Sequence, residues 1–388
     1  MNPPKKNFPY LFYYSQVVCL NLLGLATSLY LGYTHYKNYT DLTFSSFCAI
    51  TEAINCDTVA QSPWSVFLGM PVALWGIFAY SLFTLLLIPL KRHDDNAPHC
   101  WALLTILALV ASCFSVYLAV ISAFRIHSWC ILCLISYAVN FLLSFSSWIV
   151  FRRFSTVQIR PSSLLTACKA LTSAAPVRFG IPLLIGLLVA TQLLLPAYWI
   201  QEADVTNPKV TTGVTKEGSP WIGAENPQFT IEEFTDYQCF QCRKMHFYLR
   251  QLINRFPERI RLVHRHYPLD HEFNKAIAPN PFHIGSGKLA LIAIVASERG
   301  MFWVVNDALY KAVQLKDEKI QLNEFAELMK LDVERLAFDM YSAKTLGHLR
   351  HDILNGLQHK LTGTPSFTVN GEVYQKLLPP HLLQEIIK

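Results

Sequence analysis

Six of the ten cysteines fall into three pairs, and two of those pairs have the spacing of redox-active dithiols. Cys130 and Cys133 form a Cys-x-x-Cys pair in HSWCILCLISYAVN, and Cys239 and Cys242 form a second one in DYQCFQCRKM. Two thiols at this spacing can exchange a disulfide with another molecule, because a thiolate attacks a disulfide sulfur through a mixed-disulfide intermediate. The first pair leads into apolar sequence and the second lies in ordinary polar sequence, so the two pairs meet different solvents.

The pair Cys239 and Cys242 stands at a predicted junction between a strand and a helix. Residues 228–236, QFTIEEFTD, have the pattern of a strand with a buried face, and RKMHFYLRQLINRF has a helical pattern. A helix N-terminus carries unpaired backbone N–H groups and a positive dipole end, so it stabilises a thiolate at the first cysteine. The alternative is half of a zinc site, but the available histidines form no standard zinc pattern; they are His264, His266, His271 and His283. We therefore predict a redox dithiol and no metal site.

The elements that must position Cys130 and Cys133 are predicted to be membrane-spanning helices. Of the 388 residues, 52% are hydrophobic and only 15% are charged, and the long apolar runs lie in residues 1–200. A bilayer crossing needs roughly 20 apolar residues. Five segments are long enough, and we place them near 12–33, 66–90, 102–124, 131–151 and 179–200. The alternative is five buried helices of a soluble protein, which the lengths of the runs and the charges between them disfavour.

The basic residues between the apolar runs predict the orientation of the chain. They concentrate before the first span, between the second and third, and between the fourth and fifth, namely at Lys5, Lys6, Lys91, Arg92, Arg152, Arg153, Arg160, Lys169 and Arg178. Because cytoplasmic loops are enriched in Lys and Arg, we expect the N-terminus in the cytoplasm and residues 202–388 outside. The formal charge of +6 thus reflects membrane topology, and we predict no nucleic-acid partner. All three cysteine pairs, including Cys48 and Cys56 in the first loop, then face the oxidising side, where disulfides persist.

The pattern of residues 220–388 resembles the thioredoxin fold in its DsbA-like form. After the Cys-x-x-Cys helix we expect a strand at 259–269 and a helical section at 286–359. Two short strands should follow in GTPSFTVNGEVYQ around the turn Asn370-Gly371, with a final helix in PHLLQEIIK. The resemblance implies an α/β domain with a helical insertion. Residues 201–227 are predicted to be a tether.

The same resemblance implies roles for residues around Cys239. Thr364-Pro365 matches the place where the DsbA-like family has a cis peptide beside the active disulfide, which leaves the preceding carbonyl free to pair with a substrate chain. A buried acid six residues before the first cysteine also recurs in that family, and Glu233 stands at that position. It is expected to assist proton transfer from the second thiol. Glu232 is adjacent, and strand alternation buries only one of the two; the match favours Glu233.

Residues 10–152 resemble the vitamin K epoxide reductase family, as found in bacterial proteins that re-oxidise thiol oxidases. The resemblance depends on the loop cysteines Cys48 and Cys56, on Ser62 and Tyr137, and on a Cys-x-x-Cys pair at the mouth of a later span. It implies a four-helix bundle around a quinone. In that family the membrane pair faces the quinone and the loop pair carries electrons to it, while the serine and the tyrosine lie near the redox centre.

Within this family pattern the two membrane cysteines have different roles. Cys133, the deeper residue, is expected to face the quinone, and Cys130 is expected to exchange with the loop pair. Asp57, which follows Cys56, belongs either to the redox centre or to a cap of the loop, and both interpretations stay open.

The two resemblances predict an order of domains. A quinone-reducing membrane domain is expected at 1–155, a cytoplasmic loop with a fifth transmembrane helix at 156–201, a linker at 202–219, and an extracytoplasmic DsbA-like domain at 220–388. They imply an enzyme of the bacterial inner membrane that forms disulfides in exported proteins with reduced cysteines. Ubiquinone or menaquinone from the membrane pool would be its electron acceptor.

The predicted electron path runs from client thiols through three cysteine pairs to quinone, in the order Cys239/Cys242, Cys48/Cys56 and Cys130/Cys133. A disulfide isomerase or reductase is the first alternative, because the Phe-Gln dipeptide between the soluble cysteines differs from the Pro-His of strongly oxidising relatives. The second alternative is a membrane-anchored chaperone. Quinone coupling argues against the first, and a chaperone has no need of three cysteine pairs.

Overall fold

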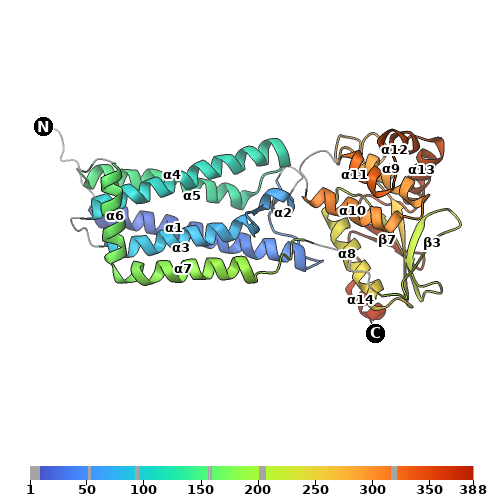
Figure 1. Ribbon diagram of the computed structural model, residues 1–388, viewed down its shortest axis with the longest axis horizontal. Coiled ribbons are helices and arrows are strands. Elements are labelled where there is room, and N and C mark those ends of the chain that lie inside the picture. Colours follow the sequence, from blue (N-terminus) through green and yellow to red (C-terminus); the bar gives the residue numbers. More distant parts are fainter. Residues whose placement is uncertain are drawn as a thin grey trace. The chain divides into compact units, whose positions relative to one another are not determined.

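The structure is a computed structural model, and it describes residues 9–50, 54–91, 96–155, 157, 160–200, 207–315 and 321–387. The chain forms two compact units, Met1–Tyr198 and Trp199–Lys388. The first unit consists mainly of long helices, and the second has a mixed sheet with helices around it (Figure 1). The basic residues Lys5, Lys6 and Arg92, which contribute to the predicted orientation, lie outside the described residues.

Within the described residues, five helices of the first unit are long and apolar enough to cross a membrane. They are α1 (Tyr10–Thr40), α3 (Val72–Leu87), α4 (Ala97–Ile121), α5 (Ile131–Phe154) and α7 (Ala175–Leu194). The helix α1 packs against α3 and α5, α4 packs against α5, and α7 lies against α3 (Figure 1). The protein is therefore a multi-pass membrane protein, and the predicted helical fold class of its N-terminal half is confirmed.

The start of the second span differs from the prediction. The span was expected at 66–90, but its helix begins only at Val72, because Val66–Phe67 (β1) and Met70–Pro71 (β2) pair as a short antiparallel hairpin. Pro71 stands just before the helix rather than inside it. A proline has no N–H to donate, so it is tolerated at a helix start and breaks the hydrogen-bond ladder further in. This hairpin connects the first loop to α3.

The end of the fifth span also differs from the prediction. The span was expected at 179–200, but α7 ends at Leu194, and Leu195 has an extended backbone. The next residue is Pro196, and steric conflict with a proline ring disfavours the helical conformation in the residue before it. The predicted loop between the fourth and fifth spans holds a further short helix, α6 (Pro161–Ser173).

A chain of polar side chains crosses the apolar bundle. Tyr80 of α3 donates its hydroxyl proton to Asn140 Oδ1 of α5 at 2.8 Å, and Asn140 Nδ2 donates to Ser115 Oγ of α4 at 2.9 Å. Hydrocarbon offers no replacement for a lost hydrogen bond, so this chain fixes how the three helices approach one another. The helix α1 approaches the Tyr80 ring closely at Gly24, where a Cβ atom would collide with the ring.

The second unit is built on a six-stranded sheet with the order β3-β4-β6-β5-β7-β8. The strands are β3 (Thr211–Val214), β4 (Pro220–Gly223), β5 (Phe229–Thr235), β6 (Ile260–His266), β7 (Ser366–Val369) and β8 (Glu372–Gln375). The parallel strands β5 and β6 are connected by α8 (Phe240–Arg255), and the other neighbours pair antiparallel. The Cys-x-x-Cys pair therefore lies where central strand β5 leads into α8, as predicted.

A group of helices is inserted between β6 and β7. Its members are α9 (Ser286–Ser297), α10 (Phe302–Leu315), α11 (Leu322–Leu328), α12 (Val333–Met340) and α13 (Ala343–Gln358), and α14 (Pro380–Ile387) closes the unit. The predicted helical section is thus confirmed, with turns between its helices. The predicted hairpin is also confirmed, since Asn370 and Gly371 have φ values of 49° and 93° between β7 and β8. Positive φ at both central residues is what a tight hairpin turn requires.

The predicted tether over 201–227 is wrong for residues 211–223. Here β3 and β4 pair with each other, and β4 adds to β6 at the edge of the sheet. The strand β3 begins at Thr211, inside the predicted linker 202–219. Each of these strands has only four residues, so neither shows a recognisable period in the sequence. The segment was predicted to be a tether because the turn-forming residues between the two strands resemble the composition of a linker.

Candidate redox sites

The first loop and the start of α5 bring three cysteines into one cluster. Cys48 and Cys56 form a disulfide, and Cys130 packs beside them among apolar side chains. The backbone holds the two segments together, because the Asn55 N–H donates to the Trp129 carbonyl at 2.9 Å. All three cysteines are buried, with at most 3% of their surface exposed. The structure therefore places the loop pair next to the membrane pair, as the predicted electron path requires.

Cys130 is the cap of helix α5. Its sulfur accepts a hydrogen bond from the Cys133 N–H at 3.2 Å, and both residues are free thiols. The first turn of a helix has N–H groups without partners in the helix, and these favour a negative sulfur. Cys130 is thus positioned to exchange as a thiolate, while Cys133 lies one turn into the helix.

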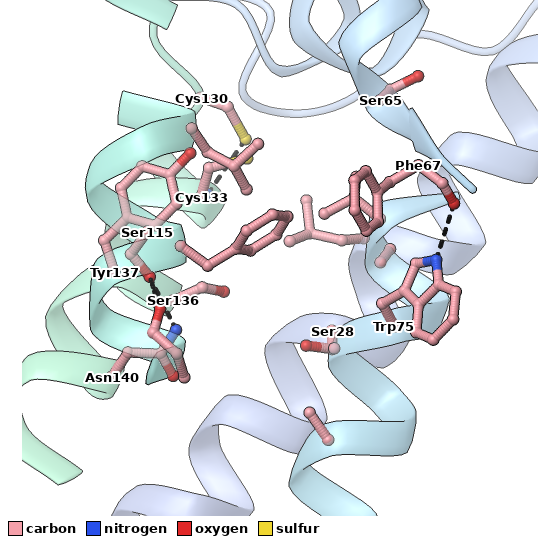
Figure 2. A pocket seen from close by; sticks show the side chains of 18 of the residues that line it. Ser28, Ser65, Phe67, Trp75, Ser115, Cys130, Cys133, Ser136, Tyr137 and Asn140 are labelled. Atoms are coloured by element: carbon pink, nitrogen blue, oxygen red, sulfur yellow. Dashed lines mark hydrogen bonds between the residues drawn. The ribbon is translucent and has the colours of Figure 1, made fainter. Parts of the chain in front are cut away.

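A cavity of about 510 Å³ opens beside these cysteines, and Cys56, Cys130 and Cys133 all contribute to its wall. Its lining is mainly apolar, and it includes the predicted site residues Ser62 and Tyr137. Figure 2 shows Cys130, Cys133 and Tyr137 on one wall, with Phe67 and Trp75 opposite them. Ser62 donates its hydroxyl proton to the Val59 carbonyl at 2.8 Å. This volume and lining suit a small apolar ligand.

Sequence reasoning missed several polar residues of this cavity. The hydrogen-bonded chain of Tyr80, Asn140 and Ser115 lines it, and within the described residues the buried Ser136 hydroxyl and Trp64 Nε1 have no hydrogen-bond partner. A buried donor without a partner is costly, and a ligand oxygen would satisfy it. Asn140 carried a signal in the sequence, because an amide in an apolar span usually has a functional or packing role.

Asp57 anchors the first loop to α1. Its carboxylate is buried, and it accepts hydrogen bonds from Asn38 Nδ2 at 3.0 Å and from the Ser46 N–H at 2.9 Å. These contacts support the loop-capping interpretation, while a role in the redox centre stays a prediction. The buried position of the loop disulfide therefore depends on Asp57.

We expect Asp57→Ala to make the Cys48–Cys56 disulfide more accessible. The substitution leaves the Ser46 N–H and the Asn38 amide without their acceptor, at a cost of about 1–3 kcal/mol for each buried group that stays unsatisfied. The measurement is the rate at which dithiothreitol reduces this disulfide, followed by alkylation and mass spectrometry. The control is Thr58→Ala, an exposed residue on the same short helix (Cys56–Gln61). Equal rates for Asp57→Ala and wild type would contradict the anchoring role.

In the second unit Cys239 is the cap of α8. Its sulfur accepts a hydrogen bond from the Cys242 N–H at 3.3 Å and lies 3.6 Å from the Thr364 carbonyl oxygen, beside the cis peptide Thr364-Pro365. Burial raises the pKa of the Cys239 thiol, but the hydrogen bond with Cys242 and the charge of His283 outweigh it, so this pKa lies below its ordinary value. Burial and the neighbouring Cys239 raise the pKa of Cys242 well above its ordinary value. Cys239 is therefore the more acidic thiol of the pair.

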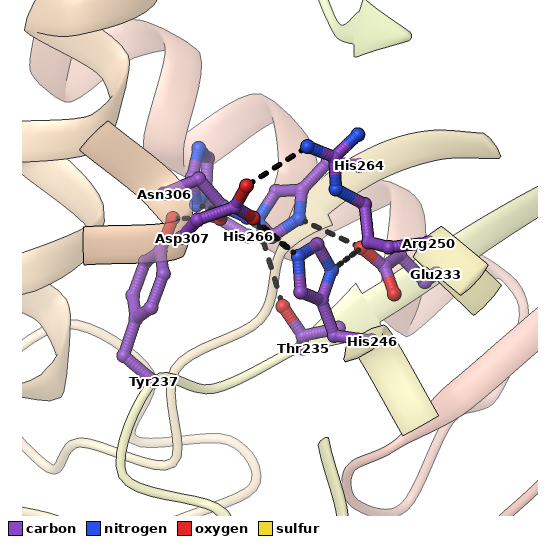
Figure 3. A network of polar contacts seen from close by, with 9 residues as sticks. All are labelled: Glu233, Thr235, Tyr237, His246, Arg250, His264, His266, Asn306 and Asp307. Atoms are coloured by element: carbon purple, nitrogen blue, oxygen red, sulfur yellow. Dashed lines mark hydrogen bonds and ion pairs between the residues drawn. The ribbon is translucent and has the colours of Figure 1, made fainter. Parts of the chain in front are cut away.

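A mostly buried network of polar and charged side chains surrounds Glu233 (Figure 3). Glu233 Oε1 contacts His246 Nδ1 at 3.0 Å and His264 Nδ1 at 3.1 Å. His246 Nε2 lies 3.0 Å from Asp307 Oδ1, and Arg250 donates to the other Asp307 oxygen at 2.8 Å. Sequence reasoning missed His246, Asp307 and Arg250. His246 and Arg250 follow Cys242 on α8 at the four-residue spacing of one helix face, which was an available signal. Asp307 comes from α10, and no spacing relates it to the cysteines.

Glu233 is ionised within this network. Burial raises its pKa, but the charge of His246 and hydrogen bonds from both histidines outweigh burial and lower the pKa to about 2. Glu233 is fully buried whereas Glu232 is partly exposed, as the strand alternation predicted. The role of Glu233 in proton transfer from Cys242 stays a prediction.

The four histidines considered as zinc ligands have other partners. His264 contacts Glu233, His266 Nδ1 lies 3.3 Å from His264 Nε2, and His271 contacts the Ala278 carbonyl. His283 Nδ1 lies 3.1 Å from Asp236 Oδ1. Within the described residues, no group of three or more His, Cys, Asp or Glu side chains could hold a metal ion.

Comparison with known proteins separates the same two units. Residues 16–148 match the vitamin K epoxide reductase family, and residues 215–388 match the thioredoxin family. The chain is 33% identical to vitamin K epoxide reductase complex subunit 1 of Mus musculus over 138 residues, which are 33% of this chain and 86% of the mouse protein.

Two further likenesses are partial. Na(+)/H(+) antiporter NhaA 3 of Salinispora tropica is 28% identical over 149 residues, which are 38% of this chain but only 21% of the antiporter. A solved thioredoxin-like oxidoreductase from Silicibacter pomeroyi DSS-3 is 25% identical, with a TM-score of 0.35, and the match covers 44% of this chain and 90% of that one. With the bundle, the loop disulfide and the second sheet domain described above, the chain belongs to the vitamin K epoxide reductase family and carries a thioredoxin domain at its C-terminus.

Proposed function

We propose that this oxidoreductase forms disulfides in exported proteins and passes the electrons to a membrane quinone. The observation that carries the proposal is the cluster in which the loop disulfide Cys48–Cys56 lies against Cys130, at the wall of an apolar cavity. Quinones are apolar and live in the bilayer, so a dithiol that reduces them needs such a cavity at the membrane. The thioredoxin domain supplies a second dithiol outside the apolar bundle.

Each transfer along the proposed path is a dithiol–disulfide exchange. A client thiolate attacks Cys239 Sγ, the Cys239–Cys242 bond breaks, and Cys242 leaves with the electron pair and takes a proton. A second client thiolate attacks the client sulfur of the mixed disulfide, and Cys239 leaves as the thiolate. The client has then lost two electrons and two protons, and the soluble pair is a dithiol. The same exchange passes the electrons to Cys48/Cys56 and then to Cys130/Cys133.

The residues of the cavity fit a quinone. The cavity is apolar and of ligand size, while Ser136 and Trp64 offer buried donors that have no partner within the described residues. Quinone, when bound, accepts two electrons and two protons. Cys133 would face it, and Tyr137 and Ser62 would orient it and exclude water. These roles, like the choice between ubiquinone and menaquinone, belong to the proposal.

The proposed setting is the bacterial inner membrane, with the N-terminus in the cytoplasm and the thioredoxin domain in the periplasmic or extracytoplasmic space. Cys130 caps the start of α5, and Arg152 and Arg153 lie in its last turn. The helix has 24 residues, so these ends lie about 36 Å apart, enough to cross the hydrocarbon core. The positive-inside bias then supports an outer position for all the cysteine pairs.

The test is a coupled assay on the purified full-length protein with a reduced dithiol peptide and a soluble ubiquinone analogue. We expect quinone absorbance to fall by one equivalent for each peptide disulfide formed. Cys133→Ser and Cys239→Ser should reduce the rate to background, because each removes one exchange step. Cys113→Ser changes an exposed free cysteine of α4 and should leave the rate unchanged. A Cys133→Ser variant that reduces quinone at the wild-type rate would contradict the proposal.

A further inference from the structure

An aspartate–histidine pair joins the turn before the attacking thiol of the soluble domain to a distant loop. The dipeptide between Cys239 and Cys242 is Phe240-Gln241, which brings no charge to the pair. His283 instead comes from the loop between β6 and α9, far along the chain. Its Nδ1 lies 3.1 Å from Asp236 Oδ1, three residues before Cys239.

Asp236 joins the two segments rigidly. It is buried, and its Oδ1 accepts the Gln238 N–H at 2.7 Å while its Oδ2 accepts the Leu269 N–H at 2.6 Å and the Ser286 hydroxyl at 2.8 Å. Its carbonyl accepts the Cys239 N–H at 3.1 Å. The same carboxylate thus organises the turn that presents Cys239 and the loop that carries His283.

His283 is held on this loop by further contacts. Its ring stacks on Phe282 with centroids 4.0 Å apart, and Gln238 Nε2 donates to the carbonyl of the next residue, Ile284, at 2.9 Å. The side chain of His283 is 18% exposed, so it stands at the edge of the site with a route to solvent. The ring of His283 is thus within ion-pair distance of a fully buried carboxylate.

We propose that His283, oriented by Asp236, supplies the positive charge that stabilises the Cys239 thiolate, in place of a charged residue between the two cysteines. Burial and the negative charge of Asp236 act to raise the Cys239 pKa, whereas the hydrogen bond with Cys242 and the positive charge of His283 lower it, and the net pKa lies below its ordinary value. Burial raises the pKa of Asp236, but the charge of His283 and several hydrogen bonds outweigh this, so Asp236 is an anion in contact with the His283 ring.

Other charged and titratable groups lie around the Cys239 thiol, and the test must separate their effects from the effect of His283. Cys242 is its partner, Asp236 is the nearest anion, and Asp270 lies in the His283 loop with its carboxylate on the Gly285 and Gly287 N–H groups. On α8 the cations Arg243 and Lys244 lie over the Phe240 ring. A substitution of His283 leaves these groups in place, so the change it causes at Cys239 is the contribution of His283.

The inference deepens the proposed function and rests on it. In the second exchange step Cys239 leaves the mixed disulfide as a thiolate, so a group that stabilises this thiolate makes it a better leaving group. It also stabilises the reduced pair, which makes the Cys239–Cys242 disulfide a stronger oxidant of client thiols. His283 would thus set how readily the domain oxidises its clients.

The test measures the reactivity of Cys239 in the reduced full-length protein against pH. Samples are alkylated briefly with iodoacetamide between pH 4 and 10, and the Cys239 peptide is quantified by mass spectrometry. We expect His283→Gln to raise the midpoint of this profile by about one pH unit, so that alkylation at low pH falls about tenfold. His283→Lys restores a cation at the partly exposed position and should keep the midpoint close to that of wild type.

The matched control is His271→Gln, which removes a histidine from the same loop that contacts the Ala278 carbonyl. Its Cys239 profile should follow that of wild type. A His283→Gln profile that overlies wild type would overturn the inference, and so would a His283→Lys profile that moves with His283→Gln, since the role would then be structural. The alkylation assay needs no quinone. If the wild-type protein failed to reduce quinone, the proposed function would be refuted, but the alkylation profiles would still test the role of His283.

Discussion

Full-length protein carrying Cys48→Ser together with Cys56→Ser will lose quinone reduction driven by a reduced peptide, by about a hundredfold, while reduction driven by a small dithiol will continue. The peptide delivers its electrons to Cys239/Cys242, and the tethered domain passes them on at an effective concentration near the mM range. Without the loop pair this intramolecular route has no acceptor. A small dithiol can diffuse to the Cys130–Cys133 disulfide whenever the loop opens, so it needs no relay.

The loop cysteines are buried, and this adds a structural requirement to the prediction. Cys48 and Cys56 are 0% and 3% exposed, so the loop must open before a second domain can reach its disulfide. The control is Cys19→Ser, an exposed free cysteine on α1, which should leave both rates unchanged. If the double variant kept its peptide-driven rate, the soluble pair would be exchanging with Cys130 directly, and the loop pair would leave the electron path.

The helical bundle could be predicted because its physical cause is visible along the chain. Apolar runs of bilayer length and basic residues between them indicate spans without any knowledge of tertiary contacts. The errors lie where short-range chemistry decides the boundary, as at Pro71 and at Leu195 before Pro196. The β3–β4 hairpin was missed for a related reason, since its strands gain their stability from pairing with β6 rather than from their own pattern.

The site residues divide in the same way. The cysteines have a spacing that carries chemistry, and the N-terminal cap positions of Cys130 and Cys239 followed from the helical patterns after them. The partners of Asn140 could not be read from the sequence, because Tyr80 and Ser115 are 60 and 25 residues away from it. His283 was visible only as one of several histidines, and its contact with Asp236 exists only in the folded loop.

The second large effect concerns the stability of the thioredoxin domain. His246→Leu will destabilise it by about 3–5 kcal/mol near pH 6, because the fully buried Glu233 and the partly exposed Asp307 lose the cation they share, although Asp307 keeps its contact with Arg250. The measurement is the free energy of local opening of β5 and β6, obtained by hydrogen–deuterium exchange on the full-length protein. His264→Leu is the matched control, since it removes a neighbouring histidine that also contacts Glu233.

The pH dependence distinguishes the two variants. Burial lowers the pKa of His246, but the charges of Glu233 and Asp307 outweigh burial and raise it above 6.5. The stability that His246 contributes is therefore complete below pH 6.5 and is lost as the pH rises through the raised pKa, so the penalty of His246→Leu shrinks in alkali. For His264 burial dominates and lowers the pKa, so its neutral form contributes fully above pH 6.5 and less as the pH falls. The penalty of His264→Leu should thus shrink in acid, and parallel pH profiles for the two variants would show that His246 is not the charged member of the network.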